Sequence, residues 1–317
     1  MTGYLLRRVA QGIFVLLIVT LIVFGLLQLL PGGPARAVLG SRATPQLIAA
    51  FNQQNGLNRP IFVQYGVWLG HLLSGNLGWS YNQSQSVASL ITERLPKTLA
   101  LTITSVVLAL LVGVIIGTIQ AVRRNKLFDY TSTTIGFFFY SFPPFFLGLL
   151  LVILFAVDIH LLPAEASQSS SVWAILGDPR ALVLPVLTLA LGGVALFSRY
   201  MRSSVIDNLV QDYVRTAQSK GVGQVRLLMV HVLRNALLPI VTLIGLFLPV
   251  LLSGAVVVES VFNFPGMGLL FWNAATTRDY PTELGVTVLV GVLTVAGSLL
   301  ADVLYAVLDP RVRYVRQ

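Results

Sequence analysis

The chain has 317 residues, of which 56% are hydrophobic and only 10% are charged. Soluble domains carry about 25% charged residues, so this composition excludes an ordinary soluble protein and indicates that lipid surrounds most of the chain. The absence of cysteine excludes disulfides, iron–sulfur clusters and thiolate zinc sites. The net charge of +9 does not predict nucleic-acid binding, because the basic residues lie in short stretches beside apolar segments.

Six apolar segments predict an all-α membrane protein with six transmembrane helices. Each has at least roughly 20 residues, the length that crosses a ~30 Å hydrocarbon core. The first segment could instead be a cleaved signal sequence, since Ala35-Arg-Ala37 resembles a cleavage site, but its apolar run is too long for a typical signal peptide. The predicted spans are residues 9–30, 98–122, 130–157, 181–200, 236–258 and 283–308.

The distribution of Lys and Arg predicts that both termini are cytoplasmic. Most of the 21 basic residues lie at the two termini, in the second-to-third connector, and in the loop of about 201–235 with its margins. Cytoplasmic loops of membrane proteins are enriched in Lys and Arg. We therefore expect residues 1–30 to form the cytoplasmic N-terminus and first span, 31–97 an external region with short helices, 98–308 a five-span core, and 309–317 a cytoplasmic tail.

The external region is too long to be a simple connector. Thr44-Pro45 predicts the start of a short helix and Gly56 its end, and residues 64–73 predict a second amphipathic helix. Residues 75–79 predict a turn. Two interpretations remain open: a cap on the outer surface, or part of a docking surface for an external partner.

Two spans carry unusual residues. Pro143-Pro144 interrupts the third span and predicts a kink, which is either a plain structural feature or a hinge that lines a transport path. The second span has a small residue at every fourth position. Such a stripe predicts close helix packing, either within the chain or against a partner subunit. The stripe consists of Ala109, Gly113, Gly117 and Ala121.

The segment that follows the fifth span runs from Glu259 to Gly268 and contains Phe262 and Phe264. Its Pro265-Gly266 pair predicts a turn, and its aromatic side chains suit a membrane interface. The segment is therefore either an interface anchor or an external gate over a path. Candidate path or gate residues are Phe139, Phe142, Pro143, Glu259, Phe262, Pro265 and Gly266.

The stretch Asp-Tyr-Val-Arg-Thr-Ala-Gln-Ser-Lys-Gly, residues 212–221, predicts a short helix in the loop of about 201–235. Asp212 can cap its start, Gly221 can end it in a left-handed turn, and Lys220 suits the helix dipole. Tyr213, Val214 and Ala217 are expected on one face. A short helix in a cytoplasmic loop is well suited to binding by another protein.

Other features predict no chemistry of their own. Asp302 is the one carboxylate inside a predicted span, and either ion coupling or a structural pairing with Arg would explain it. Histidines 71, 160 and 231 are isolated, so no metal site is predicted. Lys220-Gly-Val-Gly-Gln224 lacks the Gly-Lys-Ser/Thr of a P-loop, so no ATP site and no cofactor are expected in this chain.

Several stretches together resemble a known family. Arg215-Thr-Ala217, Gly221 and Leu237-Leu-Pro239 resemble the EAA loop of bacterial ABC importer permeases, in a variant similar to the dipeptide/oligopeptide branch. Arg215 stands where the generic loop has Glu. The B-type subunit of that branch, a binding-protein-dependent transport system inner-membrane component, is also similar in three other stretches: Tyr4–Arg8, Glu259–Gly268 and Ala301–Arg311.

The resemblance implies a type I ABC importer permease fold and a multi-pass location in the bacterial inner membrane. It also implies a second homologous permease, in a heterodimer, two ABC ATPase subunits that bind ATP and Mg, and an external solute-binding protein that delivers a peptide or another small solute. The loop would then hold the coupling helix that docks on an ATPase. The residues assigned to ATPase coupling are Asp212, Tyr213, Arg215, Thr216, Ala217, Lys220 and Gly221.

Two other function classes compete with this assignment. A secondary transporter or channel that ATP does not drive would need an inverted repeat or buried coupling charges, and only Asp302 fits. A purely structural membrane protein would need neither the interrupted third span nor a coupling-type loop. The leading hypothesis is the non-catalytic permease subunit of an ATP-driven peptide importer.

Overall fold

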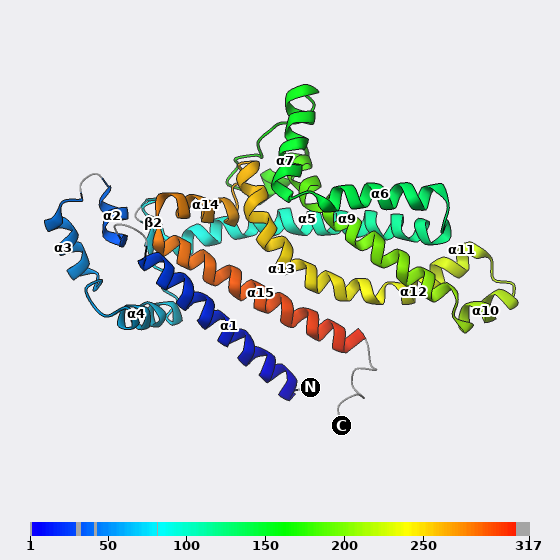
Figure 1. Ribbon diagram of the computed structural model, residues 1–317, viewed down its shortest axis with the longest axis horizontal. Helices are drawn as coiled ribbons and strands as arrows, with labels where there is room; N and C mark the ends of the chain where they lie inside the picture. The colour runs from blue at the N-terminus through cyan, green and yellow to red at the C-terminus, as the bar shows by residue number, and fades with distance from the viewer. Residues whose placement is uncertain (1, 30–32, 41–42, 81, 309–317) are drawn as a thin grey trace. The chain divides into compact units, whose positions relative to one another are not determined.

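The computed structural model describes residues 2–29, 33–40, 43–80 and 82–308, and nearly all of its regular structure is helical (Figure 1). The chain forms two compact units. The first contains Met1–Thr98 and Pro265–Ala296, and the second contains Leu99–Phe264 and Gly297–Gln317. This division rests on contacts within the chain, and it groups Pro265–Ala296 with Met1–Thr98. The expected division into an external region of residues 31–97 and a membrane core of residues 98–308 stays a prediction.

The first unit holds the N-terminal helix and the short helices expected in residues 31–97. The helix α3 begins as its sequence predicts: the side chain of Thr44 accepts a hydrogen bond from the Leu47 amide at 3.3 Å, and Pro45 occupies the first turn. Gly56, at φ +67°, follows its end. The elements are α1 (Thr2–Gln28), α2 (Gly33–Leu39), α3 (Pro45–Gln54), α4 (Ile61–Leu73), β1 (Trp79–Ser80), β2 (Gln85–Ser86), the start of α5 (Val87–Val122), α14 (Met267–Thr277) and most of α15 (Tyr280–Leu308).

Glycines bring α1 and α15 close together within the first unit, where Figure 1 shows the two helices side by side. A Cβ on Gly12 would lie 2.4 Å from Cγ1 of Val295, and a Cβ on Gly291 would lie 2.6 Å from Cδ2 of Leu16. Real Cβ atoms do not approach this closely, so the absence of a side chain at both positions permits the packing.

The second unit contains the proline-interrupted segment and the long loop. The helices α6 and α7 are separated at Phe142 and Pro143, whose ψ angles of 134° and 139° are extended. In chain order, the elements of this unit are the rest of α5, α6 (Leu127–Ser141), α7 (Pro144–Val152), the π-helical η2 (Ile153–Asp158), α8 (Val172–Leu176), α9 (Pro179–Leu209), α10 (Asp212–Ser219), α11 (Gln224–Arg226), the π-helical η3 (Leu227–Val232), α12 (Leu233–Ala236) and α13 (Leu238–Val261). The helices α6, α7, α8, α12 and α13 pack against α9.

Four described helices are long and apolar enough to cross a membrane: parts of α1 and α15, and the whole of α5 and α9. The third predicted span is not one kinked helix, because α6 and the α7–η2 segment meet at an angle of 104°. Two consecutive prolines remove two ladder donors and hold the preceding backbone extended, which explains why the break exceeds a simple kink. The fifth predicted span, residues 236–258, coincides with α13 from Leu238 onward, and its first two residues precede that helix. The side chain of Asp302 lies outside the described residues.

The small-residue stripe of α5 packs within the chain. All four residues are buried, and a Cβ on Gly117 would lie 2.4 Å from the carbonyl oxygen of Ser198 in α9. A Cβ on Gly113 would lie 2.7 Å from Cβ of Phe197. The intramolecular interpretation is therefore confirmed, since α9 already occupies this face of α5.

Candidate functional site: the loop around α10 and the adjoining helices

The predicted loop helix is present as α10 and begins at Asp212. Gln211 is the N-cap residue, with an extended backbone (φ −75°, ψ 152°) and no side-chain cap bond. Asp212, which the sequence predicts as the cap, is instead the first helical residue, because the chain leaving α9 becomes extended one residue earlier. The negative charge of its carboxylate still interacts favourably with the positive N-terminal end of the helix dipole.

The C-terminal end of α10 forms a Schellman motif around Gly221. The Gly221 amide donates to the Gln218 carbonyl at 2.9 Å, and the Val222 amide donates to the Ala217 carbonyl at 3.2 Å. Gly221 has φ +78°, a left-handed conformation that a side chain would strain. The predicted left-handed end of this helix is confirmed.

Two apolar residues fix α10 to the rest of the second unit. Val214 and Ala217 are buried, with exposed fractions of 0% and 8%, and belong to one apolar cluster with Met201 and Val205 of α9. Leu227 of η3 joins the same cluster. Ala217 therefore holds α10 in place and is not presented to another molecule by this structure.

The opposite face of α10 is polar and open. Asp212, Arg215, Thr216 and Lys220 are exposed. Arg215 and Asp212 approach at 3.9 Å, but with side chains 72% and 98% exposed this pair contributes little stability. Tyr213 lies at the edge, and its hydroxyl donates to Oδ1 of Asn208 at 2.7 Å.

The cluster that holds α10 reaches several other helices. It also contains Ala121 of α5, Val232 of η3, Ala236 of α12 and Ile240 of α13. The Ser204 hydroxyl in α9 donates to the carbonyl of Ala236 at 2.9 Å. A force applied to α10 therefore acts on a packed apolar cluster that includes the ends of α9 and α13.

A buried ion pair that the sequence analysis missed lies beside this loop. Arg202 of α9 contacts Asp129 of α6 through two bonds of 2.7 Å, and the side chain of Asp129 is only 3% exposed. The Asn125 amide donates to the same carboxylate at 3.0 Å. The two residues are 73 positions apart, and the basic connector before Asp129 indicated only membrane orientation.

Three of the predicted path residues of the second unit lie in or against one apolar cluster. Phe262 is fully buried in it, and the partly buried Phe139 and Phe142 pack against it. The rings of Phe138 and Phe142 meet edge-to-face at 4.7 Å. Pro143 is exposed and Glu259 is buried. The structure thus brings the three phenylalanines together beside the break between α6 and α7.

Pro265 and Gly266 belong to the first unit. Both are buried, and Gly266 is the extended N-cap residue of α14. The next amide, that of Met267, donates to Oγ1 of Thr98 at 2.8 Å. The Pro-Gly turn therefore sets the start of α14.

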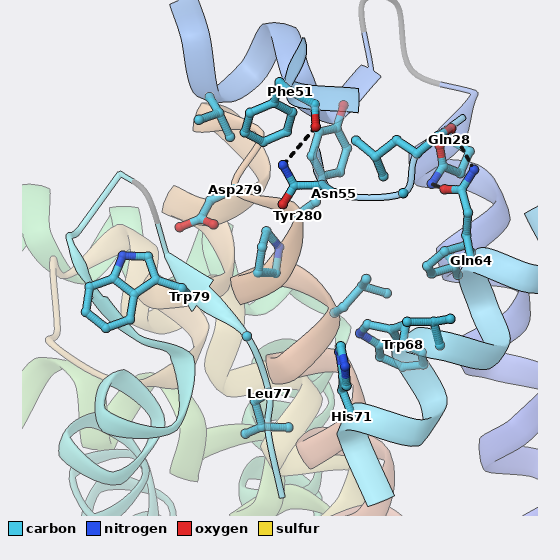
Figure 2. A pocket seen from close by; sticks show the side chains of 18 of the residues that line it. Gln28, Phe51, Asn55, Gln64, Trp68, His71, Leu77, Trp79, Asp279 and Tyr280 are labelled. Carbon is cyan, nitrogen blue, oxygen red and sulfur yellow. Dashed lines mark hydrogen bonds between the residues drawn. The ribbon is translucent and has the colours of Figure 1, made fainter. Parts of the chain in front are cut away.

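The first unit also contains a cavity of about 540 Å³, seen in Figure 2. Its walls combine aromatic rings with amide side chains. Gln64 donates to the carbonyls of Leu57 and Arg59 at 2.9 and 2.7 Å and accepts from Gln28 at 3.1 Å. The cavity is lined by, among others, Gln28, Phe51, Asn55, Gln64, Trp68, His71, Trp79, Asp279 and Tyr280.

The carboxylate of Asp279, which lines this cavity, already has hydrogen-bond donors within the chain. It is buried and accepts hydrogen bonds from the hydroxyls of Ser80 and Thr282, the latter at 2.9 Å. Within the described part of the chain, no three His, Asp or Glu side chains gather where they could hold a metal ion.

Family descriptions match both parts of the chain. Residues 109–314 match "Binding-protein-dependent transport system inner membrane component", and residues 1–102 match the N-terminal part of such membrane components.

Curated relatives match over the full length. A putative peptide permease protein of Brucella suis biovar 1 is 42% identical over 99% of both chains. The oligopeptide transport system permease protein AppB of Bacillus subtilis is 38% identical, over 99% of this chain and all of that protein. The glutathione transport system permease protein GsiC of Salmonella choleraesuis is 40% identical with the same coverage.

One solved structure, an amino acid ABC transporter crystallised with histidines, resembles this fold with a TM-score of 0.53. The likeness covers 69% of this chain and 94% of that one at 18% identity. At that identity the likeness concerns the fold alone.

Proposed function

Because the chain belongs to the family of binding-protein-dependent transport system inner membrane components, we propose that it moves short peptides inward as one permease of a larger complex. It is a non-catalytic membrane subunit of an ABC transporter. In the proposed complex it pairs with a second, homologous permease, two ABC ATPases bind ATP and Mg on the cytoplasmic side, and a solute-binding protein delivers the cargo from outside.

The observation that carries the coupling role is the two-sided construction of α10. Its apolar side is packed into the chain through Val214 and Ala217, and its polar side is open at Asp212, Arg215 and Lys220. A partner protein that binds the open side forms polar contacts without disturbing the packed side. We assign this open side to the ATPase subunit.

The proposed mechanism follows from that arrangement. When ATP draws the two ATPases together, α10 moves with the ATPase that holds it, and the shared cluster transmits the movement to α9 and α13. The spans then tilt between outward-open and inward-open states, and hydrolysis of ATP resets them. Because α10 makes different contacts with the ATPase in its two states, ATP binding shifts the equilibrium between the outward-open and inward-open states.

This role places the loop of about 201–235 and both termini in the cytoplasm and gives the chain six spans in the bacterial inner membrane. The bias of Lys and Arg toward that side supports the orientation. The phenylalanines 139, 142 and 262 and the turn at Glu259 are then proposed to line or gate the path. Their grouping at the α6–α7 break supports this, because a broken helix can pivot there.

Peptide is the proposed cargo, because full-length relatives are described as peptide, oligopeptide and glutathione permeases. Glutathione is itself a small peptide-like molecule, so the three descriptions share backbone amides and a free carboxylate as recognisable groups.

The test is the ATPase activity of the complete complex in lipid, with and without its binding protein loaded with a di- or tripeptide. Stimulation by the loaded protein supports the proposal. Stimulation only by another solute would keep the architecture and overturn the cargo. Absence of any associated ATPase would favour a secondary transporter instead.

A further inference from the structure

The segment between α10 and α13 is helical and contains one π-helical turn. It consists of α11, η3 and α12, residues 224–236. The Leu233 amide donates to the carbonyl of Leu228, five residues earlier, where an α-helix would use the carbonyl four residues earlier. The Leu237 amide donates to the Leu233 carbonyl at 3.0 Å, and the Val241 amide donates to the Leu237 carbonyl at 3.1 Å. The backbone therefore passes from this segment into α13 without a loop (Figure 1).

The π-helical turn keeps one face of the segment buried. Leu227 and Val232 are 4% and 0% exposed, and Ala236 and Ile240 are 0% and 1% exposed. All four belong to the apolar cluster that holds α10. Leu227 and Val232 are five residues apart, and the wider π-helical turn between them allows both side chains to enter the same cluster. Packing against α9 and α10 therefore fixes this inner face.

The outer face of the segment is apolar and open. Val225, Met229 and Val230 are 77%, 60% and 54% exposed. Met229 and Val230 follow Val225 by four and five residues, the same steps that separate the residues of the buried face. Apolar surface is more stable outside water, and a group of exposed apolar side chains marks a contact with a protein or a membrane. The outer face therefore indicates an apolar neighbour.

The charges beside this outer face are positive. Arg226 and Arg234 are exposed, and neither forms an ion pair with a carboxylate in the described part of the chain. The sequence contains no Asp or Glu from residue 213 to residue 258. Apolar side chains flanked by Arg are typical of helices that lie in the membrane interface, where the cations meet lipid phosphates.

We propose that the outer face of residues 224–236 lies in the cytoplasmic leaflet, with Met229 and Val230 among the acyl chains and Arg226 and Arg234 on the headgroups of anionic phospholipids. This rests on the proposed function, which places the loop in the cytoplasm and α13 in the bilayer. Because the segment continues directly into α13, it begins at the membrane surface, and its charges complement anionic headgroups. These two features favour lipid over a protein partner. The segment then holds the loop at the membrane while α10 binds the ATPase.

The experiment attaches one spin label to the complete complex, which is straightforward because this chain has no cysteine. The partner subunits are made free of cysteine as well. Collisions with oxygen, which concentrates in lipid, are compared with collisions with a water-soluble nickel chelate, in nanodiscs of phosphatidylcholine and phosphatidylglycerol. A label on Met229→Cys should collide more with oxygen than with the chelate. The control Gln53→Cys, at an exposed position of α3 in the predicted external region, should show the opposite preference.

Each other result at Met229→Cys contradicts the proposal. A label that collides mainly with the chelate lies in water. A label that neither reagent reaches is covered by protein, such as the ATPase or the second permease. Either result would overturn the inference. The label is carried at a side chain that is 60% exposed, so the reading does not depend on a substitution in the packed cluster.

The anionic headgroup is tested with the same label. With Arg226 and Arg234 in place, replacing pure phosphatidylcholine by the mixture with phosphatidylglycerol should increase the preference of the label for oxygen. Combining Arg226→Gln with Arg234→Gln should remove this response. The matched control Arg215→Gln changes an exposed arginine of α10 and should preserve it. Equal readings in the two lipids, or a response that persists without the two arginines, would overturn the assignment to anionic lipid.

Failure here is distinguishable from failure of the proposed function. Peptide-loaded binding protein would still stimulate the ATPase of the native complex if only the location of this face were wrong. A complex that ignores peptide in that assay would remove the proposed cargo, while the collision measurement at Met229→Cys would still report whether the segment contacts lipid.

Discussion

Asp129 and Arg202 form a two-point ion pair that fastens the first turn of α6 to α9, with Nε–Oδ1 and Nη2–Oδ2 distances of 2.7 Å. α9 continues from this pair to Leu209 and then leads into α10. The pair therefore fixes α6 against the helix that precedes the coupling segment.

Asp129→Asn should destabilise the second unit, because it leaves the Arg202 guanidinium without its charge partner. Removal of one member of a buried pair costs about 3–5 kcal/mol, and the 30% exposure of Arg202 places the expected loss toward or below the lower limit. A lowered midpoint of thermal unfolding of the purified complex would show it. Asp207→Asn changes an exposed carboxylate on α9, the helix of Arg202, and should leave the midpoint unchanged.

Gly117→Ala should impair folding, because its methyl group would meet the Ser198 carbonyl at 2.4 Å and backbone cannot yield as a side chain can. Overpacking of this kind costs about 1–3 kcal/mol. Gly192→Ala is the matched control on α9, since a Cβ there meets nothing within 4 Å. Equal membrane yield and equal stability of the two variants would contradict the packing of α5 against α9.

Gly221→Pro should uncouple ATP turnover from transport. Proline cannot adopt φ +78° and lacks the N–H that Gly221 donates to Gln218, so the end of α10 would unravel while the spans remain intact. We expect membrane insertion to persist and peptide uptake to fall to background. Gly223→Ala, at a glycine with open space around it and φ −64°, should transport normally.

Ala217→Arg should give the same uncoupling by another route, since a guanidinium cannot remain in the apolar cluster and would displace α10 from Val205 and Leu227. Uptake and ATPase activity are measured together in proteoliposomes. Native uptake by this variant would count heavily against the coupling role of α10.

Trp79→Ala distinguishes the two interpretations of the external region. Trp79 lines the first-unit cavity and is 50% exposed. If the region docks the binding protein, the variant should weaken stimulation by loaded binding protein and leave basal ATPase activity unchanged. Unaltered stimulation would favour a simple cap.

The sequence predicted the parts of this structure that depend on neighbouring residues. Thr44-Pro45, Gly221 and the stripe around Gly117 each act within a turn or along one helix, so their consequences are visible in local spacing. The one-residue error at Asp212 arose because the path of the chain out of α9 selects the cap. The predicted kink at Pro143 is a break of 104°, because two consecutive prolines remove two ladder donors and hold the preceding backbone extended.

The remainder depends on contacts between distant residues. Asp129 and Arg202, Gln120 and Ser132, and the burial of Ala217 all arise from the packing of α5, α6 and α9, which no local pattern encodes. The grouping of Pro265–Ala296 with the first unit is of the same kind. A single sequence contains no direct signal for these pairings.

The most direct test of the central claim places one cysteine on the open face of α10, which is straightforward in a chain that has none. Thr216→Cys carrying a photoactivatable benzophenone should cross-link to the ATPase subunit in the assembled complex, with a yield that changes when ATP binds. Asn82→Cys, in the predicted external region, is the control and should not cross-link to it. Cross-linking of Thr216→Cys only to lipid or to other membrane subunits, with or without ATP, would contradict the assignment of α10 as the coupling helix.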